Sequence, residues 1–262
     1  MEQLRTVKKP QQAIPTFAQT VGLLMKVRPP SIRFCGLTAN TTQPENLHVK
    51  FNVDVKVQNN PARLFSLMHD IIASYENWET RLAPRLLIGL WHPSFISACK
   101  ENLPYCKRSY IGVDPALARK HFWDHVDAFS MWFGCLTTAD GERFRKECKA
   151  AGKKLMVWTV NDPACMMEAV RWGVDAILTD VTKTWLELRS ALQGASFVLP
   201  LLCRLTPSTV DYDKIACQHS RRFLWTTVFY YTPVQALTRM KSKAWLERVA
   251  GPFQISVVSP VQ

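Results

Sequence analysis

Two ionisable side chains near the end of a predicted strand could take part in metal or phosphate chemistry. Asp54 and Lys56 lie two residues apart in the alternating segment His48–Val57, so their side chains project from one face of the strand. The Asp54 carboxylate suits a hard divalent cation, and the Lys56 ammonium suits a phosphate. On spacing alone, an internal ion pair that satisfies two buried charges is the favoured interpretation, because D-x-K is a very common tripeptide.

Other polar and aromatic side chains follow later predicted strands, and barrel enzymes gather their chemistry at such strand ends. In chain order these are Trp91 with His92, Asp114, Trp158 with Asn161, and Asp180. His92 could act in catalysis, or it could simply begin the turn before a helix. Asp180 is better explained as a cap of the following helix. His121 and His125, four residues apart on a predicted helix, could share a metal ion, but no third ligand is evident.

These residues depend on an alternation of strands and helices that repeats six times. The predicted strands are His48–Val57, Arg85–Trp91, Ser109–Asp114, Ala128–Gly134, Lys154–Val160 and Asp175–Asp180. The predicted helices are Thr16–Lys26, Pro61–Tyr75, Ser94–Asn102, Pro115–His125, Ala139–Ala151, Pro163 to just before Gly173, and Thr182–Leu192. Crossovers of this length indicate parallel strands, and the absence of a dinucleotide glycine fingerprint favours a barrel over a doubly wound sheet.

We therefore predict an α/β fold, a (β/α)8 TIM-type barrel that is incomplete, with about six of its eight strands and a helical C-terminal tail. Convincing sequence for the other two strands is found neither before nor after the alternating region. The predicted parts are an N-terminal remnant with one barrel helix (1–26), an irregular insert (27–43), the barrel with strands 3 to 8 (44–193), a second irregular insert (194–210) and a basic, aromatic tail (211–262).

Charge and composition limit the range of partners. The net charge is +12, from 33 Lys and Arg against 21 Asp and Glu, and both ends are more basic per residue than the middle. Such ends could contact an anionic membrane or phosphate-bearing molecules, or could form a solvated periphery. The aromatic segment Phe223–Leu237, flanked by arginines, could be an interfacial anchor for peripheral membrane contact or could pack on the barrel. We expect no nucleic acid partner, because no RNA-recognition signature is present.

The cysteine pattern and the N-terminal residues predict the cellular location. The eight cysteines form no C-x-x-C pair, which indicates reduced and mostly buried thiols. The first ten residues are polar and basic and contain no apolar run of the kind found in secretory signals. We therefore expect an intracellular protein, cytoplasmic or peripheral on a membrane.

Three motifs together resemble the glycerophosphodiester phosphodiesterase family. They are NVDVK at Asn52–Lys56, VWTVNDP at Val157–Pro163 and GVDAILTD at Gly173–Asp180. The match covers roughly residues 48–192, and Leu4–Met25 is similar to the segment that precedes the first matching strand in the family. The sequences of the segments LWHP and AFSM most resemble the fungal branch similar to phosphatidylglycerol-directed phospholipases C.

The resemblance implies a phosphoric diester hydrolase of lipid metabolism that acts by metal-assisted acid/base chemistry on a glycerophosphodiester or a phosphatidylglycerol-like lipid. It implies that Asp54 is a ligand of a divalent cation, Mg or Ca, and that Lys56 contacts the phosphate during catalysis. It implies that Trp158 forms an aromatic wall near the substrate. We expect Asn161 to bind substrate beside it, and His92 is a further catalytic candidate.

The sequence also departs from the family's pattern. The resemblance implies an opening H-R motif, an E-x-D strand end and a following H-D motif, and none has a counterpart before Leu4. We therefore expect an N-terminally truncated member in which cation binding is weakened or lost and activity is impaired. One alternative is a non-catalytic relic that binds lipid or phosphate through Lys56 and the basic ends. Another is an incomplete gene model whose product begins upstream of Met1.

Overall fold

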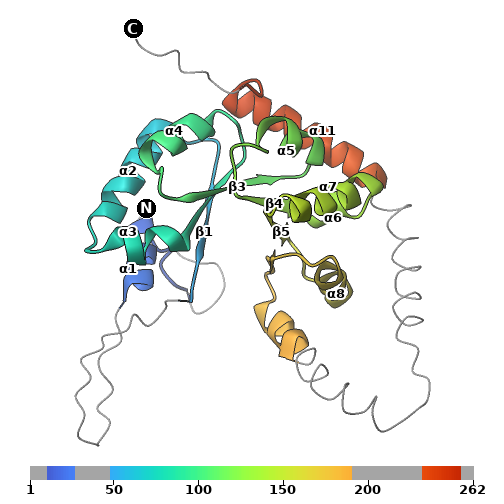
Figure 1. Cartoon of the computed structure of the whole chain (residues 1–262), viewed down its shortest axis with the longest axis horizontal. Coiled ribbons are helices and arrows are strands. Elements are labelled where there is room, and N and C mark those ends of the chain that lie inside the picture. The colour runs from blue at the N-terminus through green and yellow to red at the C-terminus, as the bar shows by residue number, and fades with distance from the viewer. Residues whose placement is uncertain (1–10, 27–47, 191–231, 255–262) are drawn as a thin grey trace, which may run out of the picture. The chain divides into compact units, whose positions relative to one another are not determined.

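The computed structural model describes residues 11–26, 48–190 and 232–254 (Figure 1). The predicted inserts at 27–43 and 194–210, and most of the aromatic segment 223–237, lie outside these ranges. The chain divides after Arg108 into two compact units. Six strands are found in the described part, and neighbouring strands within each unit pair in parallel. The predicted fold class is confirmed: it is α/β with parallel strands, that of an incomplete TIM-type barrel.

Unit 1 contains the first two strands and the helices that connect and cover them. The strands β1 (Phe51–Val55) and β2 (Leu86–Leu90) pair in register, with Phe51 opposite Leu86 and Val55 opposite Leu90. The helices are α1 (Phe17–Met25), α2 (Pro61–Ala73), α3 (Trp78–Arg81), the 3-10 helix η1 (Ala83–Arg85) and α4 (Phe95–Asn102). The helix α2 packs against both α1 and α4.

Local sequence explains where α2 begins and which face it buries. The Asn60 side chain accepts a hydrogen bond from the backbone N–H of Arg63 at 3.0 Å, and Pro61 occupies the first helical position, which needs no N–H donor. Phe65 and Ile72 are fully buried. The ring of Phe65 meets that of Phe95 from α4 edge-on, with centroids 6.2 Å apart.

Arg85 is a buried charged residue that joins three segments of unit 1. Its side chain is 6% exposed and donates to the carbonyl oxygens of Val49 at 2.8 Å and Leu24 at 2.7 Å. The Leu24 carbonyl lies in the last turn of α1, where helix carbonyls lack helical partners and a cation is favoured. Burial, followed by the nearby charge of Arg81, lowers the pKa of Arg85.

Replacing Arg85 tests this connection. In Arg85→Met the buried Leu24 carbonyl and the part-buried Val49 carbonyl lose these donors, so the free energy of unfolding should fall by about 1–3 kcal/mol. Urea denaturation followed by circular dichroism measures the change. Arg63→Met, which alters an exposed arginine of α2, is the matched control and should unfold like the parent protein. Equal stability of the two variants would contradict the proposed role.

Unit 2 contains four strands and the C-terminal helix. The strands are β3 (Lys107–Gly112), β4 (Ala128–Trp132), β5 (Lys154–Trp158) and β6 (Ala176–Ile177). The helices are α5 (Pro115–His121), α6 (Phe133–Leu136), α7 (Ala139–Ala150), α8 (Pro163–Arg171) and α11 (Thr232–Ala250), with a further helical segment over residues 182–190. The core is aromatic: the buried ring of Phe129 on β4 contacts Phe144 of α7 with centroids 5.1 Å apart.

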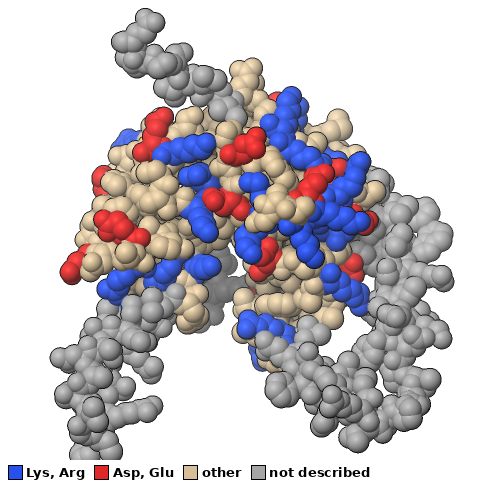
Figure 2. All heavy atoms as spheres, in the orientation of Figure 1, with Lys and Arg blue, Asp and Glu red and all other residues tan. Residues whose placement is uncertain are grey.

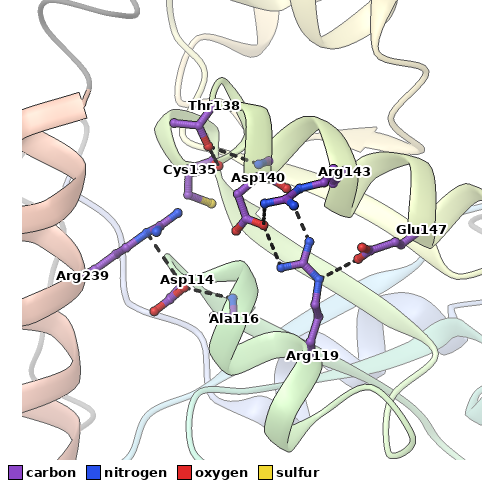
Figure 3. Close-up of polar contacts among 10 residues, drawn as sticks. Asp114, Ala116, Arg119, Cys135, Thr138, Asp140, Arg143, Glu147 and Arg239 are labelled. Atoms are coloured by element: carbon purple, nitrogen blue, oxygen red, sulfur yellow. Dashed lines mark hydrogen bonds and ion pairs between the residues drawn. The ribbon is translucent and has the colours of Figure 1, made fainter.

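The helix α11 is the predicted helical tail, and it is packed into unit 2. Gln235, only 3% exposed, donates its side-chain N–H to the carbonyl of Gly134 and to Thr137 Oγ1. Arg239 faces Asp114 with 3.9 Å between Nε and Oδ1, and Cys135 lies beside them (Figure 3). Since Asp114 follows β3 and Gly134 follows β4, α11 holds two of the segments that leave the carboxyl ends of the strands.

The segment just after α11 contacts α5 through Phe253, and burial and charge act on a histidine there. The rings of His121 and Phe253 lie 5.6 Å apart. Burial, and then the positive charges of Lys120 and Lys243, lower the pKa of His121 below its ordinary value.

A lowered histidine pKa makes the folded state bind fewer protons than the unfolded state, so stability is lost as pH falls below the unfolded pKa of about 6.5. We expect the free energy of unfolding to decrease between about pH 7 and about pH 5, and His121→Gln to remove part of that decrease. Urea denaturation at several pH values measures it. A pH dependence in His121→Gln equal to that of the parent protein would contradict this explanation.

Several element boundaries differ from the predictions. The predicted strand Ala128–Gly134 ends at Trp132, where the apolar sequence turns into α6. The helix α5 ends at His121, and the N–H of His125 bonds to the carbonyl of Phe122 in a turn, so the histidine pair does not lie on one helix. The five described cysteines are free, and four of them are buried, as predicted.

Candidate functional site

The predicted pair at the carboxyl end of β1 is present, but it is not buried. Asp54 is the fourth residue of β1, and Lys56 directly follows the strand. Lys56 Nζ donates to Asp54 Oδ2 at 2.7 Å, and the two side chains are 58% and 44% exposed respectively. The internal pair expected from spacing alone is therefore an exposed pair. Both charges remain accessible to a ligand in solution.

Trp91, at the end of β2, completes this group. Its indole Nε1–H donates to Asp54 Oδ1 at 2.7 Å, and Lys56 Nζ lies 5.0 Å from the centroid of its ring. The parallel register explains the contact, because Val55 stands opposite Leu90 and the residues that follow both strands are neighbours. We call these three residues the Asp54–Lys56–Trp91 cluster. From the sequence, Trp91 was expected at the end of a strand and had no assigned role. The sequence does not give the register between β1 and β2, which is what brings Trp91 to Asp54.

His92 lies next to the cluster in sequence but is fully buried. Its Nδ1 and Ser94 Oγ are 2.8 Å apart, and the backbone N–H of Ser94 also points to Nδ1 at 3.3 Å. These contacts shape the turn that leads into α4. Catalysis by His92 stays a prediction.

The other predicted site residues belong to unit 2. The Asn161 amide connects the segment after β5 to the segment after β6. Its Nδ2–H donates to Asp180 Oδ2 at 3.0 Å, and its Oδ1 accepts from Thr179 Oγ1 at 3.0 Å and from the Asp180 N–H at 2.9 Å. Trp158 is half-buried, and its indole N–H donates to the Ser130 carbonyl at 2.9 Å. The structure thus brings Asn161 and Asp180 together.

The described residues do not form the cation site that the sequence led us to expect. Within residues 11–26, 48–190 and 232–254, no three His, Cys, Asp or Glu side chains are grouped as metal ligands would be. Asp54 supplies one carboxylate, and its two oxygens already accept from Trp91 and Lys56. Hard divalent cations take six or more oxygen ligands, so Asp54 alone is a weak site.

A double-mutant cycle tests whether the Asp54–Lys56 pair exists for stability. Because both side chains are largely exposed and screened by water, their coupling free energy in Asp54→Asn, Lys56→Met and the double variant should be below about 1 kcal/mol. Urea denaturation of the four proteins gives the value. Coupling of several kcal/mol would mean that the pair is structural, as the spacing alone suggested.

A sequence model described as the glycerophosphoryl diester phosphodiesterase family matches residues 1–184. No curated protein matches this chain.

Solved structures of such enzymes are similar to this chain at low identity. A glycerophosphodiester phosphodiesterase from Parabacteroides distasonis is 21% identical, with 56% of this chain and 60% of that one covered and a TM-score of 0.43. A phosphodiesterase from Oleispira antarctica, in complex with the product sn-glycerol-3-phosphate, is 16% identical, with 55% of each chain covered and a TM-score of 0.45. The Thermotoga maritima enzyme is 14% identical, with 53% and 57% covered and a TM-score of 0.39. The chain thus spans 55% to 60% of the length of these three structures.

Proposed function

Because the chain belongs to the glycerophosphoryl diester phosphodiesterase family, we propose that it binds a glycerophosphodiester or a phosphatidylglycerol-like lipid and hydrolyses it weakly. The members of this family are phosphoric diester hydrolases. The sequences of the segments LWHP and AFSM support a lipid substrate like that of the fungal branch. Weak turnover is proposed because the 262 residues contain no H-R and no E-x-D motif.

One observation carries the substrate proposal: the Lys56 ammonium is accessible and oriented. It is held at the carboxyl end of β1 by the Asp54 carboxylate, and the indole N–H of Trp91 holds that carboxylate in turn. A phosphodiester oxygen can accept a hydrogen bond from the Lys56 ammonium. Because the Lys56 side chain is already held in one orientation, less conformational entropy is lost on binding. The positive charge of Lys56 then stabilises the negative charge that builds up on phosphorus oxygens in the transition state.

We propose supporting roles for the remaining candidates. In unit 2, Asn161 would hold the segment after β5 in position through its hydrogen bonds with Thr179 and Asp180, and contact of Trp158 with a substrate stays a prediction. The buried His92, bonded to Ser94, would orient the turn before α4. A divalent cation would bind weakly at Asp54, as the single carboxylate of the cluster supplies few of the ligands that a hard cation needs.

A second candidate function is binding without turnover, as in a relic of the family. The lack of a cation site among the described residues favours it, since metal-assisted hydrolysis needs the cation. Metal-dependent release of the alcohol from a glycerophosphodiester, followed with the purified full chain, separates the two candidates. Robust turnover, comparable to that of a complete family member, would overturn the proposal of weak hydrolysis.

Substitution of Lys56 tests the binding step directly. The full chain should bind sn-glycerol 3-phosphate in a calorimetric titration, and Lys56→Met should weaken that binding by roughly tenfold or more, as expected for the loss of a charge-assisted hydrogen bond. Lys50→Met, at an exposed lysine just before β1, is the matched control and should bind like the parent. Equal weakening in both variants would mean that general charge, and not Lys56, attracts the anion.

A further inference from the structure

Both oxygens of the Asp54 carboxylate accept hydrogen bonds from the other two residues of the Asp54–Lys56–Trp91 cluster. Oδ1 accepts from the indole Nε1–H of Trp91, and Oδ2 accepts from Lys56 Nζ, each at 2.7 Å. These are the short distances of hydrogen bonds to a charged group, which are stronger than those between neutral groups. The negative charge of Asp54 is therefore balanced by side chains of this chain itself.

A divalent cation does not fit beside these two donors. A cation that bound both carboxylate oxygens would have to displace Trp91 and Lys56 together. Each oxygen has a second lone pair, but a cation bound there would lie close to the Lys56 ammonium and be repelled by it. The cluster also offers a single carboxylate, whereas a hard cation takes several oxygen ligands. The cluster therefore does not fit the cation that the family resemblance implies, which agrees with weak cation binding at Asp54.

The Lys56 ammonium can still bind a phosphate in this arrangement. An ammonium has more N–H donors than the one that Asp54 uses. Nζ lies 5.0 Å from the centroid of the Trp91 ring, and the Lys56 side chain is 58% exposed. The ring and the carboxylate thus restrain Lys56 without covering it.

Trp91 has a second effect on anion binding, which acts through Asp54. A carboxylate whose only partner was Lys56 would repel an approaching phosphate and hold the ammonium more tightly. The positive end of the indole N–H dipole lies at Oδ1 and reduces the negative potential of the carboxylate, so it weakens both effects. On this oxygen the N–H of Trp91 takes the place that a cation would otherwise have.

We propose that the Asp54–Lys56–Trp91 cluster binds the phosphate group of its ligand without a divalent cation, and that Trp91 positions Lys56 for this through Asp54. The inference rests on the proposed function, because it concerns the same ligand and the same lysine. It goes further in giving Trp91 a role, and in separating the binding of the phosphate from any need that hydrolysis has for a cation.

Calorimetric titration of the purified full chain with sn-glycerol 3-phosphate tests both parts of the proposal. The parent should bind with the same affinity in EDTA as in an excess of MgCl2 or CaCl2. Trp91→Phe keeps an aromatic ring beside Lys56 but removes the N–H, so binding in EDTA should weaken by roughly fivefold. In a Lys56→Met background the same substitution should have no further effect, because Trp91 acts through Lys56.

General positive charge is the alternative that a control has to exclude. The chain carries a net charge of +12, and Lys and Arg side chains are scattered over the face that Figure 2 shows, with Asp and Glu among them. Trp78→Phe is the matched control, because Trp78 is a half-buried tryptophan of unit 1 that packs on Tyr105, with ring centroids 4.5 Å apart. It should bind like the parent. Equal affinity of Trp91→Phe and the parent would overturn the role of Trp91, as would a loss that persists in the Lys56→Met background.

The indole N–H resonance of Trp91 reports on Asp54 directly. In a proton–nitrogen correlation spectrum it is the tryptophan signal that Trp91→Phe removes. It should stay in place when MgCl2 or CaCl2 is added to the ligand-free chain, and it should move when sn-glycerol 3-phosphate is added. Phosphate binding that requires a cation, or a Trp91 signal that moves with MgCl2 alone, would overturn this inference and leave the proposed function standing. A chain that binds no sn-glycerol 3-phosphate in any of these solutions would overturn both.

Discussion

The parallel register of β1 and β2 is the constraint on which the candidate site depends. A parallel pair places the carboxyl ends of both strands at the same edge, so residues distant in sequence meet there. Here Val55 stands opposite Leu90, and one consequence is that Trp91 reaches Asp54 across 37 positions of sequence. A shift of one residue would turn these side chains to the other face of the sheet. The helix α2 lies in the crossover that connects β1 to β2, and a parallel pair of strands requires such a crossover.

Much of this architecture could be predicted from sequence because its signals are local. The caps of α1 and α2 at Thr16 and Asn60 appear as residue types at the expected positions, and both helices begin there. The strand predicted at Ala128–Gly134 was too long for an equally local reason. Its seven residues are apolar or small throughout, and periodicity cannot separate a buried strand from a buried helical turn in such a run.

The candidate site was predictable in its residues but not in its environment. The D-x-K spacing correctly predicted that Asp54 and Lys56 share a face, but burial depends on what lies above that face, which spacing does not encode. The role of His92 was ambiguous for a related reason, since a histidine after a strand can face the rim or the core. The contacts of α11 were not predictable at all, because Gln235 and Gly134 share no local pattern.

The docking of α11 also constrains how the chain can fold during synthesis. Gln235 and Gly134 are separated by 101 positions, so joining them closes a long loop whose entropic cost must be met by contacts made at the same time. The strands and helices between Ser109 and Arg171 can pair as they emerge from the ribosome, whereas the segments after β3 and β4 must wait for α11. Until then, the Gly134 carbonyl lacks its hydrogen bond from Gln235 and accepts only from Thr137 in its own turn. Unit 2 therefore completes its packing only after α11 has been translated.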